Sequence, residues 1–207
     1  MKIFIDLTSK YTVIIFLCLF FSKHANTDTL ANIEDDEFYI GDINAPITII
    51  EYASLSCSHC ADFHLNTLPE LIESYVDSGK AKIVFRDFPF NYPALLGSMV
   101  LRCVPLDVRF DYATALYKLQ SKWVLRENSK SIKELYKIMQ SGGMSQDEFN
   151  DCIYNADLEN EILEELMAAQ KEFDIKSTPT LIINGNKIEG NKPVKDLRQI
   201  IDKILSQ

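Results

Sequence analysis

Hydrophobic residues along the chain follow two periods, one typical of strands and one typical of helices. The run over 47–53 is rich in branched side chains and almost continuously apolar, which is typical of a strand buried on both faces of a sheet. Only Glu51 interrupts this run. A Gly185-Asn186 pair between two shorter runs indicates the turn of a hairpin. The other strands are predicted at 38–41, 81–88, 180–183 and 187–189.

Helical spacing of apolar residues marks much of the remaining chain. It predicts one helix over 57–77, which Pro69 should kink because proline cannot continue the hydrogen-bond ladder. Residues 92–174 have a helical pattern throughout, without a convincing strand. Within them, Ser145 followed by Glu148 is the capping-box start of a helix.

The predicted order of elements is strand, strand, helix, strand, helical block, strand, strand and helix, with the last helix opening at Pro193. Without the helical block, these elements form a small α/β unit with a central sheet and helices on both faces. We therefore predict an α/β fold in which an all-helical subdomain at 92–174 is inserted into a domain formed by 38–91 and 175–207.

The first 25 residues have the layout of a signal peptide. Lys2 and Lys10 precede an apolar stretch at 11–21, and polar residues follow it. This stretch is shorter than the roughly 20 residues that a membrane-spanning helix needs. We expect a signal at 1–25 and a polar linker at 26–37, and an uncleaved N-terminal anchor is the alternative. Either way the folded part of the protein is expected to be exported, to the periplasm.

Length and charge limit the classes of function that fit the chain. Its 207 residues, 47% of them hydrophobic, suffice for one domain with an insertion and a real core. The net charge of -9 argues against a nucleic-acid partner, because phosphate binding needs a basic surface. Removal of the signal takes away Cys18 and leaves four cysteines, an even number that suggests two disulfides in an oxidising compartment.

The motif Cys57-Ser58-His59-Cys60 directly follows the predicted buried strand. At the first turn of a helix, Cys57 lies at the positive end of the helix dipole, which favours its thiolate. Cys60 lies three positions later on the same face and one turn deeper. Thiol-disulfide exchange needs such a pair, in which one cysteine attacks and the other resolves the mixed disulfide.

The neighbours of the motif carry further expectations. His59 can add positive charge or a hydrogen bond to the thiolate, and Ser54 or Ser56 can cap the helix. A charged carboxylate in a doubly buried strand is costly, so the pKa of Glu51 should rise. Glu51 is therefore a candidate proton relay for Cys60. Pairing with a lysine or a position at a sheet edge is an equally weighted alternative for this carboxylate.

A structural disulfide or half of a metal site are the alternatives to a redox pair. A metal would need two more ligands, and only His59 and His64 lie near in sequence, without a second Cys-X-X-Cys motif. We expect His64 to lie on the helix surface. Trp123 and the stretch Phe90-Asn91-Tyr92 are expected to serve packing rather than to form a platform for substrate.

Three features together resemble the DsbA branch of the thioredoxin superfamily: Glu51, the motif at 57–60, and Thr178-Pro179 before a strand, with a helical insertion between the last two. The resemblance spans about 38–205. It implies that Cys57 is the exposed nucleophile, Cys60 the resolving thiol and Glu51 a buried acid. It also implies that Pro179 is a cis-proline and that the backbone of Thr178 pairs with the substrate chain.

The two remaining cysteines, Cys103 and Cys152, resemble the extra disulfide of alpha-proteobacterial DsbA relatives. Two separate buried thiols are the alternative. The family implies no cofactor and no metal, reduced folding exported proteins as substrates, and a membrane partner of the DsbB type that restores the disulfide. We expect a monomer.

We therefore expect a thiol:disulfide oxidoreductase that introduces disulfide bonds into exported proteins through Cys57 and Cys60. Ser58 occupies the position at which the commonest motif of this branch has proline, which leaves the strength of the oxidant open. A disulfide reductase or isomerase on the same fold is one alternative. A metal-binding chaperone that uses both thiols and a histidine is another.

Overall fold

The computed structural model describes residue 33 and residues 37–207, which belong to one compact unit. The predicted signal at 1–25 and most of the linker at 26–37 lie outside the described residues. Within the described part of the chain, no helix is long and apolar enough to cross a membrane.

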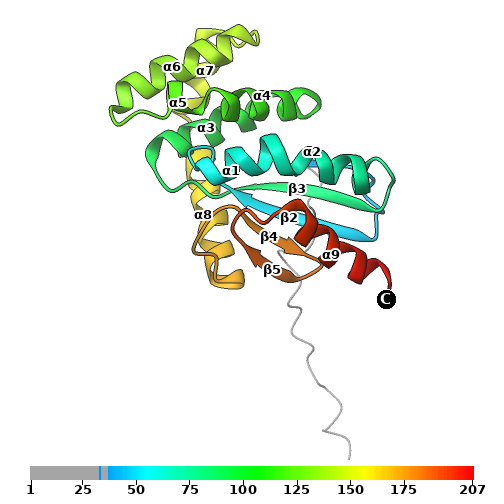
Figure 1. Cartoon of the computed structure of the whole chain (residues 1–207). Coiled ribbons are helices and arrows are strands. Elements are labelled where there is room, and N and C mark those ends of the chain that lie inside the picture. The colour runs from blue at the N-terminus through cyan, green and yellow to red at the C-terminus, as the bar shows by residue number, and fades with distance from the viewer. Residues whose placement is uncertain (1–32, 34–36) are drawn as a thin grey trace, which may run out of the picture. The chain divides into compact units, whose positions relative to one another are not determined.

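A five-stranded mixed sheet forms the centre of the unit, in the order β1-β3-β2-β4-β5 (Figure 1). Strands β2 and β3 run parallel, and the other neighbouring pairs are antiparallel. The central position of β2 explains its continuous apolar sequence, because both of its faces and both of its edges are covered. The strands span Tyr39–Ile40 (β1), Ile47–Ala53 (β2), Ala81–Asp87 (β3), Thr180–Ile183 (β4) and Asn186–Glu189 (β5).

The segment after β2 is helical over almost the predicted length, but two π-helical turns interrupt it. It comprises α1 (Ser58–Asp62), η2 (Phe63–Thr67), α2 (Leu68–Leu71) and η3 (Ile72–Val76). Pro69 lies in the first turn of α2, directly after η2. A proline has no N–H for the carbonyl four residues earlier and collides with it, and the wider π turn relieves both problems.

Helices fill the chain between β3 and β4, as the sequence pattern predicts. The capping box between Ser145 and Glu148 is present in full, with both reciprocal hydrogen bonds. The final helix begins one residue after Pro193, which is its N-cap. The helices span Tyr92–Arg102 (α3), Leu106–Lys118 (α4), Gln120–Trp123 (α5), Asn128–Ser141 (α6), Gln146–Ile153 (α7), Ala156–Phe173 (α8) and Val194–Leu205 (α9).

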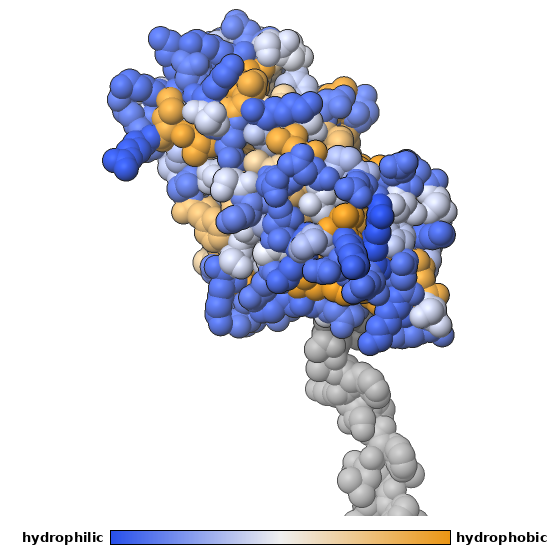
Figure 2. All heavy atoms as spheres, viewed as in Figure 1, coloured by the Kyte–Doolittle hydropathy of each residue, from blue (hydrophilic) through white to orange (hydrophobic). Residues whose placement is uncertain are grey.

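Apolar side chains form three clusters that join these layers. One cluster lies inside the helical block and includes Trp123 and the Cys60 thiol. A second lies between the sheet and the helices α2 and α9, and a third lies on the opposite face under α8 (Figure 1). The face of the unit in Figure 2 is mostly hydrophilic, with apolar patches among the helices of the block. Because Cys60 belongs to the first cluster, the helical block packs directly onto the motif.

Candidate active site

The loop between β2 and α1 carries the motif. Cys57 is the N-cap residue of α1, with an extended backbone, and its N–H donates to the Ser54 carbonyl at 3.0 Å. No side chain caps this helix, so the prediction that Ser54 or Ser56 does so is wrong. The hydroxyls of these serines instead contact each other at 3.2 Å. The first-turn N–H groups are therefore left for the Cys57 sulfur.

The two cysteines are free thiols in very different surroundings. Cys57 is partly exposed, whereas Cys60 is fully buried. A hydrogen bond from the Cys60 thiol lowers the pKa of Cys57 to about 5, with further help from Thr178 and from the main-chain N–H groups of Cys60 and His59. Partial burial opposes this lowering. Cys57 is therefore a thiolate at neutral pH, which is the reactive form.

Burial raises the pKa of Cys60 far above its usual value. The hydrogen bond that its thiol donates to Cys57 acts in the same direction, and so does the negative charge of Glu51. A main-chain N–H of Ser54 reaches the Cys60 sulfur at 3.5 Å. At neutral pH Cys57 is therefore the thiolate of the pair, and Cys60 keeps its proton.

Glu51 lies in the middle of β2 with only 1% of its surface exposed. It pairs with Phe85 of β3 on one side and with Leu181 of β4 on the other. Neither carboxylate oxygen has a hydrogen-bond partner among the described residues. Burial raises the pKa of Glu51 to about 8, so the group is mostly protonated at pH 7. No lysine pairs with it in the described structure, and β2 is not an edge strand.

The loop before β4 faces the motif although it lies more than a hundred residues away in sequence. The Thr178-Pro179 peptide bond is cis. The thiol of Cys57 donates a hydrogen bond to the Thr178 carbonyl at 3.3 Å. The Thr178 hydroxyl is buried and has no hydrogen-bond partner among the described residues. It lowers the pKa of both cysteines, so it lies where it can donate a hydrogen bond to a thiolate. This loop therefore borders the reactive sulfur directly.

The two histidines near the motif behave differently from expectation. His59 is exposed, and it is its main-chain N–H rather than its ring that stabilises the Cys57 thiolate. His64 is buried, so its predicted place on the helix surface is wrong. Its Nε2 contacts the Thr114 hydroxyl at 2.8 Å, and its ring packs on Tyr117 with 4.8 Å between ring centroids. Burial, together with the charge of a nearby lysine, lowers the pKa of His64 to about 4.

The sequence contained a signal for the burial of His64. It follows Cys60 by four positions, which places the two residues on the same side of a helix.

The aromatic side chains that were expected to serve packing differ in their exposure. Trp123 is fully buried and serves packing, whereas Phe90 and Tyr92 are 53% and 41% exposed, and the Phe90 ring packs edge-on against Phe88.

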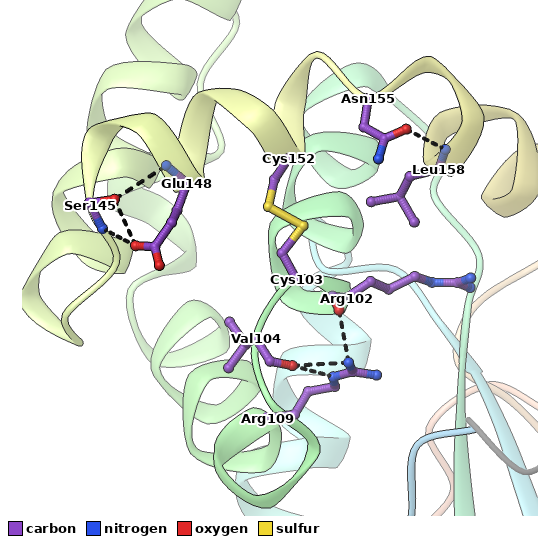
Figure 3. Close-up of a disulfide and its surroundings, with 9 residues drawn as sticks. All are labelled: Arg102, Cys103, Val104, Arg109, Ser145, Glu148, Cys152, Asn155 and Leu158. Atoms are coloured by element: carbon purple, nitrogen blue, oxygen red, sulfur yellow. Dashed lines mark hydrogen bonds between the residues drawn. A yellow bond between two sulfur atoms is a disulfide. The ribbon is translucent and has the colours of Figure 1, made fainter.

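Cys103 and Cys152 are joined by a disulfide in the structure (Figure 3). Cys103 directly follows α3, and Cys152 lies near the end of α7. The bridge therefore ties together two helices whose cysteines are 49 residues apart in sequence. Beside it, the Arg109 guanidinium donates to the carbonyls of Arg102 and Val104, which holds the chain next to Cys103 (Figure 3).

In the described part of the chain, no group of three or more His, Cys, Asp or Glu side chains is arranged to hold a metal ion. The geometry instead concentrates four features at one point: a stabilised thiolate, a buried thiol, a buried protonated carboxyl and a cis-proline loop. Such an arrangement can exchange a disulfide with another chain and can manage the proton of the leaving sulfur.

Comparison with known proteins agrees with this chemistry. The family model described as Thioredoxin matches residues 34–203. The crystal structure of Wolbachia pipientis alpha-DsbA1 is 30% identical and superposes with a TM-score of 0.80, covering 87% of this chain and 96% of that chain. BdbD from Bacillus subtilis, at 18% identity and a TM-score of 0.72, shares the fold.

Curated relatives are named for disulfide chemistry. A putative protein-disulfide oxidoreductase of Rickettsia bellii is 27% identical over 84% of this chain and 67% of its own length. A probable disulfide bond formation protein D of Bacillus cereus is 24% identical over 81% of this chain and 78% of its own length. The chain thus spans about two thirds of the length of the Rickettsia relatives that it matches. On these grounds the chain belongs to the thioredoxin superfamily and to its DsbA-like members.

Proposed function

We propose that this protein is an exported thiol:disulfide oxidoreductase that introduces disulfide bonds into folding proteins. The observation that carries the proposal is the contrast between its two thiols. The pKa of Cys57 is lowered to about 5, while burial raises the pKa of Cys60. A stabilised thiolate favours the reduced form of the pair, and a pair that favours its reduced form oxidises other dithiols.

In the proposed reaction, a substrate thiolate attacks the sulfur of Cys57 in the oxidised protein. The bond between Cys57 and Cys60 breaks, and its electron pair passes to the Cys60 sulfur. Glu51, which is buried and mostly protonated at neutral pH, supplies the proton that this sulfur takes up. Because the pKa of Cys60 is far above 9.0, the sulfur is a poor leaving group without that proton.

A second thiolate of the substrate then attacks the substrate sulfur of the mixed disulfide. Cys57 leaves as a thiolate, which the Cys60 thiol and the first-turn N–H groups stabilise. The substrate has lost two electrons and two protons and has gained a disulfide. The backbone of Thr178, beside the Cys57 sulfur, is the proposed contact for the substrate chain during these steps.

The protein then holds two thiols, and a second partner must accept their electrons. We assign this role to a membrane oxidant of the DsbB type, as in relatives of this branch. Export through the segment at 1–25 would place the protein with its substrates, and we propose that it acts there as a monomer. The disulfide between Cys103 and Cys152 suits an oxidising compartment.

The reduction potential of the Cys57-Cys60 pair, measured by equilibration with glutathione, tests the direction of electron flow. The oxidase proposal expects a potential well above that of thioredoxin, which is about −270 mV. Oxidation of a reduced two-cysteine peptide should be fast with the wild-type protein and absent with Cys57→Ala. A potential near that of thioredoxin would instead assign a reductase. Stoichiometric metal in the reduced protein, with undiminished activity of Cys57→Ala, would assign a metal-binding role.

A further inference from the structure

Gln120 holds the main chain at the nucleophile from outside the motif. It is the first residue of α5, the short helix that follows α4 in the helical block. Its side-chain Nε2 donates to the carbonyl of Leu55 at 2.9 Å and to the carbonyl of Cys57 at 3.0 Å. One amide thus contacts both ends of the three-residue turn that leads into α1.

The orientation of this amide is determined by its partners. A primary amide has two N–H donors on nitrogen, and here each donor faces a main-chain carbonyl. The reversed orientation would place the amide oxygen against two carbonyl oxygens with no proton between them. The Gln120 nitrogen therefore faces the motif.

The start of α1 needs such an external support. Cys57 is its N-cap, and among the described residues no side-chain oxygen caps the helix. The acceptor for its first-turn N–H groups is the Cys57 sulfur, and sulfur is a weaker acceptor than the oxygens that usually cap a helix. In this protein the first turn has a chemical task, because its N–H groups must point at the Cys57 sulfur rather than at water.

The helical block anchors Gln120 firmly. Trp123, at the end of the same short helix, is fully buried, and its indole N–H donates to the Leu116 carbonyl at 2.9 Å. The Asn91 amide, at the start of α3, donates to the Ser56 hydroxyl at 3.0 Å. Residues 55 and 57 are therefore bonded to Gln120 of the helical block, and residue 56 is bonded to Asn91, which directly precedes the block.

We propose that Gln120 is a positioning residue for the nucleophile: its amide fixes the main chain at Leu55 and Cys57 so that the first-turn N–H groups of α1 stay aimed at the Cys57 sulfur. The inference rests on the proposed role of Cys57. If Gln120 has this role, the helical block does more than cover the motif: it also determines how strongly the main chain stabilises the Cys57 thiolate.

Gln120→Met tests this inference, because methionine has a similar length and no hydrogen-bonding amide. Gln140→Met is the matched control, since Gln140 donates only to Tyr136 within the exposed face of α6. The thiolate absorbance of Cys57 is followed against pH, and the glutathione equilibrium and thermal unfolding are measured for each variant. We expect Gln120→Met to shift both equilibria by about three- to tenfold, away from the thiolate and toward the disulfide, the size of one lost hydrogen bond. Gln140→Met should leave both unchanged.

Gln120→Glu provides a second variant if the methionine form folds poorly. Its carboxylate would face two carbonyl oxygens and add negative charge near the thiolate, so the shift should have the same direction and be larger. If both variants unfold at lower temperature but keep the wild-type thiolate and glutathione equilibria within twofold, Gln120 is a packing residue and the inference is wrong. The thiolate titration and the reduction potential of the wild-type protein test the proposed function. The differences between the wild type and the Gln120 variants test the role of Gln120, so either proposal can fail without the other.

Discussion

The unpaired carboxyl of Glu51 should make the stability of the reduced protein depend on pH. Its pKa is about 8 in the folded protein, against an ordinary value of 4.5, because burial disfavours the charged form. Between these two values the folded state holds a proton that the unfolded state has released. The stabilisation is therefore complete below pH 4.5 and is lost as the pH rises through the folded pKa.

The size of the effect follows from the same two values. Each pKa unit corresponds to about 1.4 kcal/mol, so the contribution of Glu51 to stability should be about 3 kcal/mol smaller at pH 7 than at pH 4.5. With 1% of the residue exposed, solvent does little to screen this loss. Glu51→Gln removes the titrating group and should remove this part of the pH dependence.

Urea denaturation of the reduced protein at several pH values between 5 and 8 measures the prediction. The lowered pKa values of Cys57 and His64 make stability rise with pH in this range, and Glu51 opposes that rise. The curve of unfolding free energy against pH should therefore rise more steeply for Glu51→Gln than for the wild type. Glu164→Gln, on the exposed surface of α8, serves as the control and should follow the wild-type curve. Parallel curves for wild type and Glu51→Gln would refute the reasoning, because they would mean that Glu51 is solvated or paired in solution.

Three further predictions concern other titratable and bonded groups. His64→Phe keeps an aromatic ring in the buried site and should remove an acid-induced loss of stability. The pKa of His64 is about 4 in the folded protein against 6.5, so up to about 3 kcal/mol that is present above pH 6.5 is lost as the pH falls through 4, and urea denaturation at pH 4 to 7 measures this loss. With a peptide that has one cysteine and is supplied as its disulfide-linked dimer, Cys60→Ala should accumulate a mixed disulfide: the Cys57 thiolate attacks the dimer, one peptide thiolate leaves, and no Cys60 thiol remains to resolve the product, which mass spectrometry detects. Equal accumulation in the wild type would contradict the assignment of Cys60. The paired replacement of Cys103 and Cys152 by alanine should lower the unfolding free energy by about 4 kcal/mol according to the chain-entropy model, and an unchanged denaturation midpoint would show that the bridge does not constrain the unfolded chain.

Much of this fold was predictable because it depends on local patterns. The apolar run of β2, the capping box at Ser145 and the helical texture between β3 and β4 each reflect a period or a hydrogen bond within a few residues. The sequence shows that the hydrogen-bond ladder must break at Pro69, but not that the break takes the form of the π turn η2 before α2. The sequence left two interpretations of Glu51 open, a buried acid or a carboxylate paired with a lysine or at a sheet edge, and the central place of β2 in the sheet decided for burial.

The surroundings of the reactive sulfur depend on tertiary structure. The sequence by itself determined that Cys57 starts a helix behind a buried strand, and this local geometry already favours a thiolate. Only the folded chain decided that the Thr178 carbonyl contacts its sulfur from 121 residues away and that Gln120 holds its main chain from 63 residues away. It also decided that His64 is buried against α4 rather than exposed. These contacts are made by elements that are distant in sequence, and their formation depends on how whole helices pack, which no local period or cap encodes.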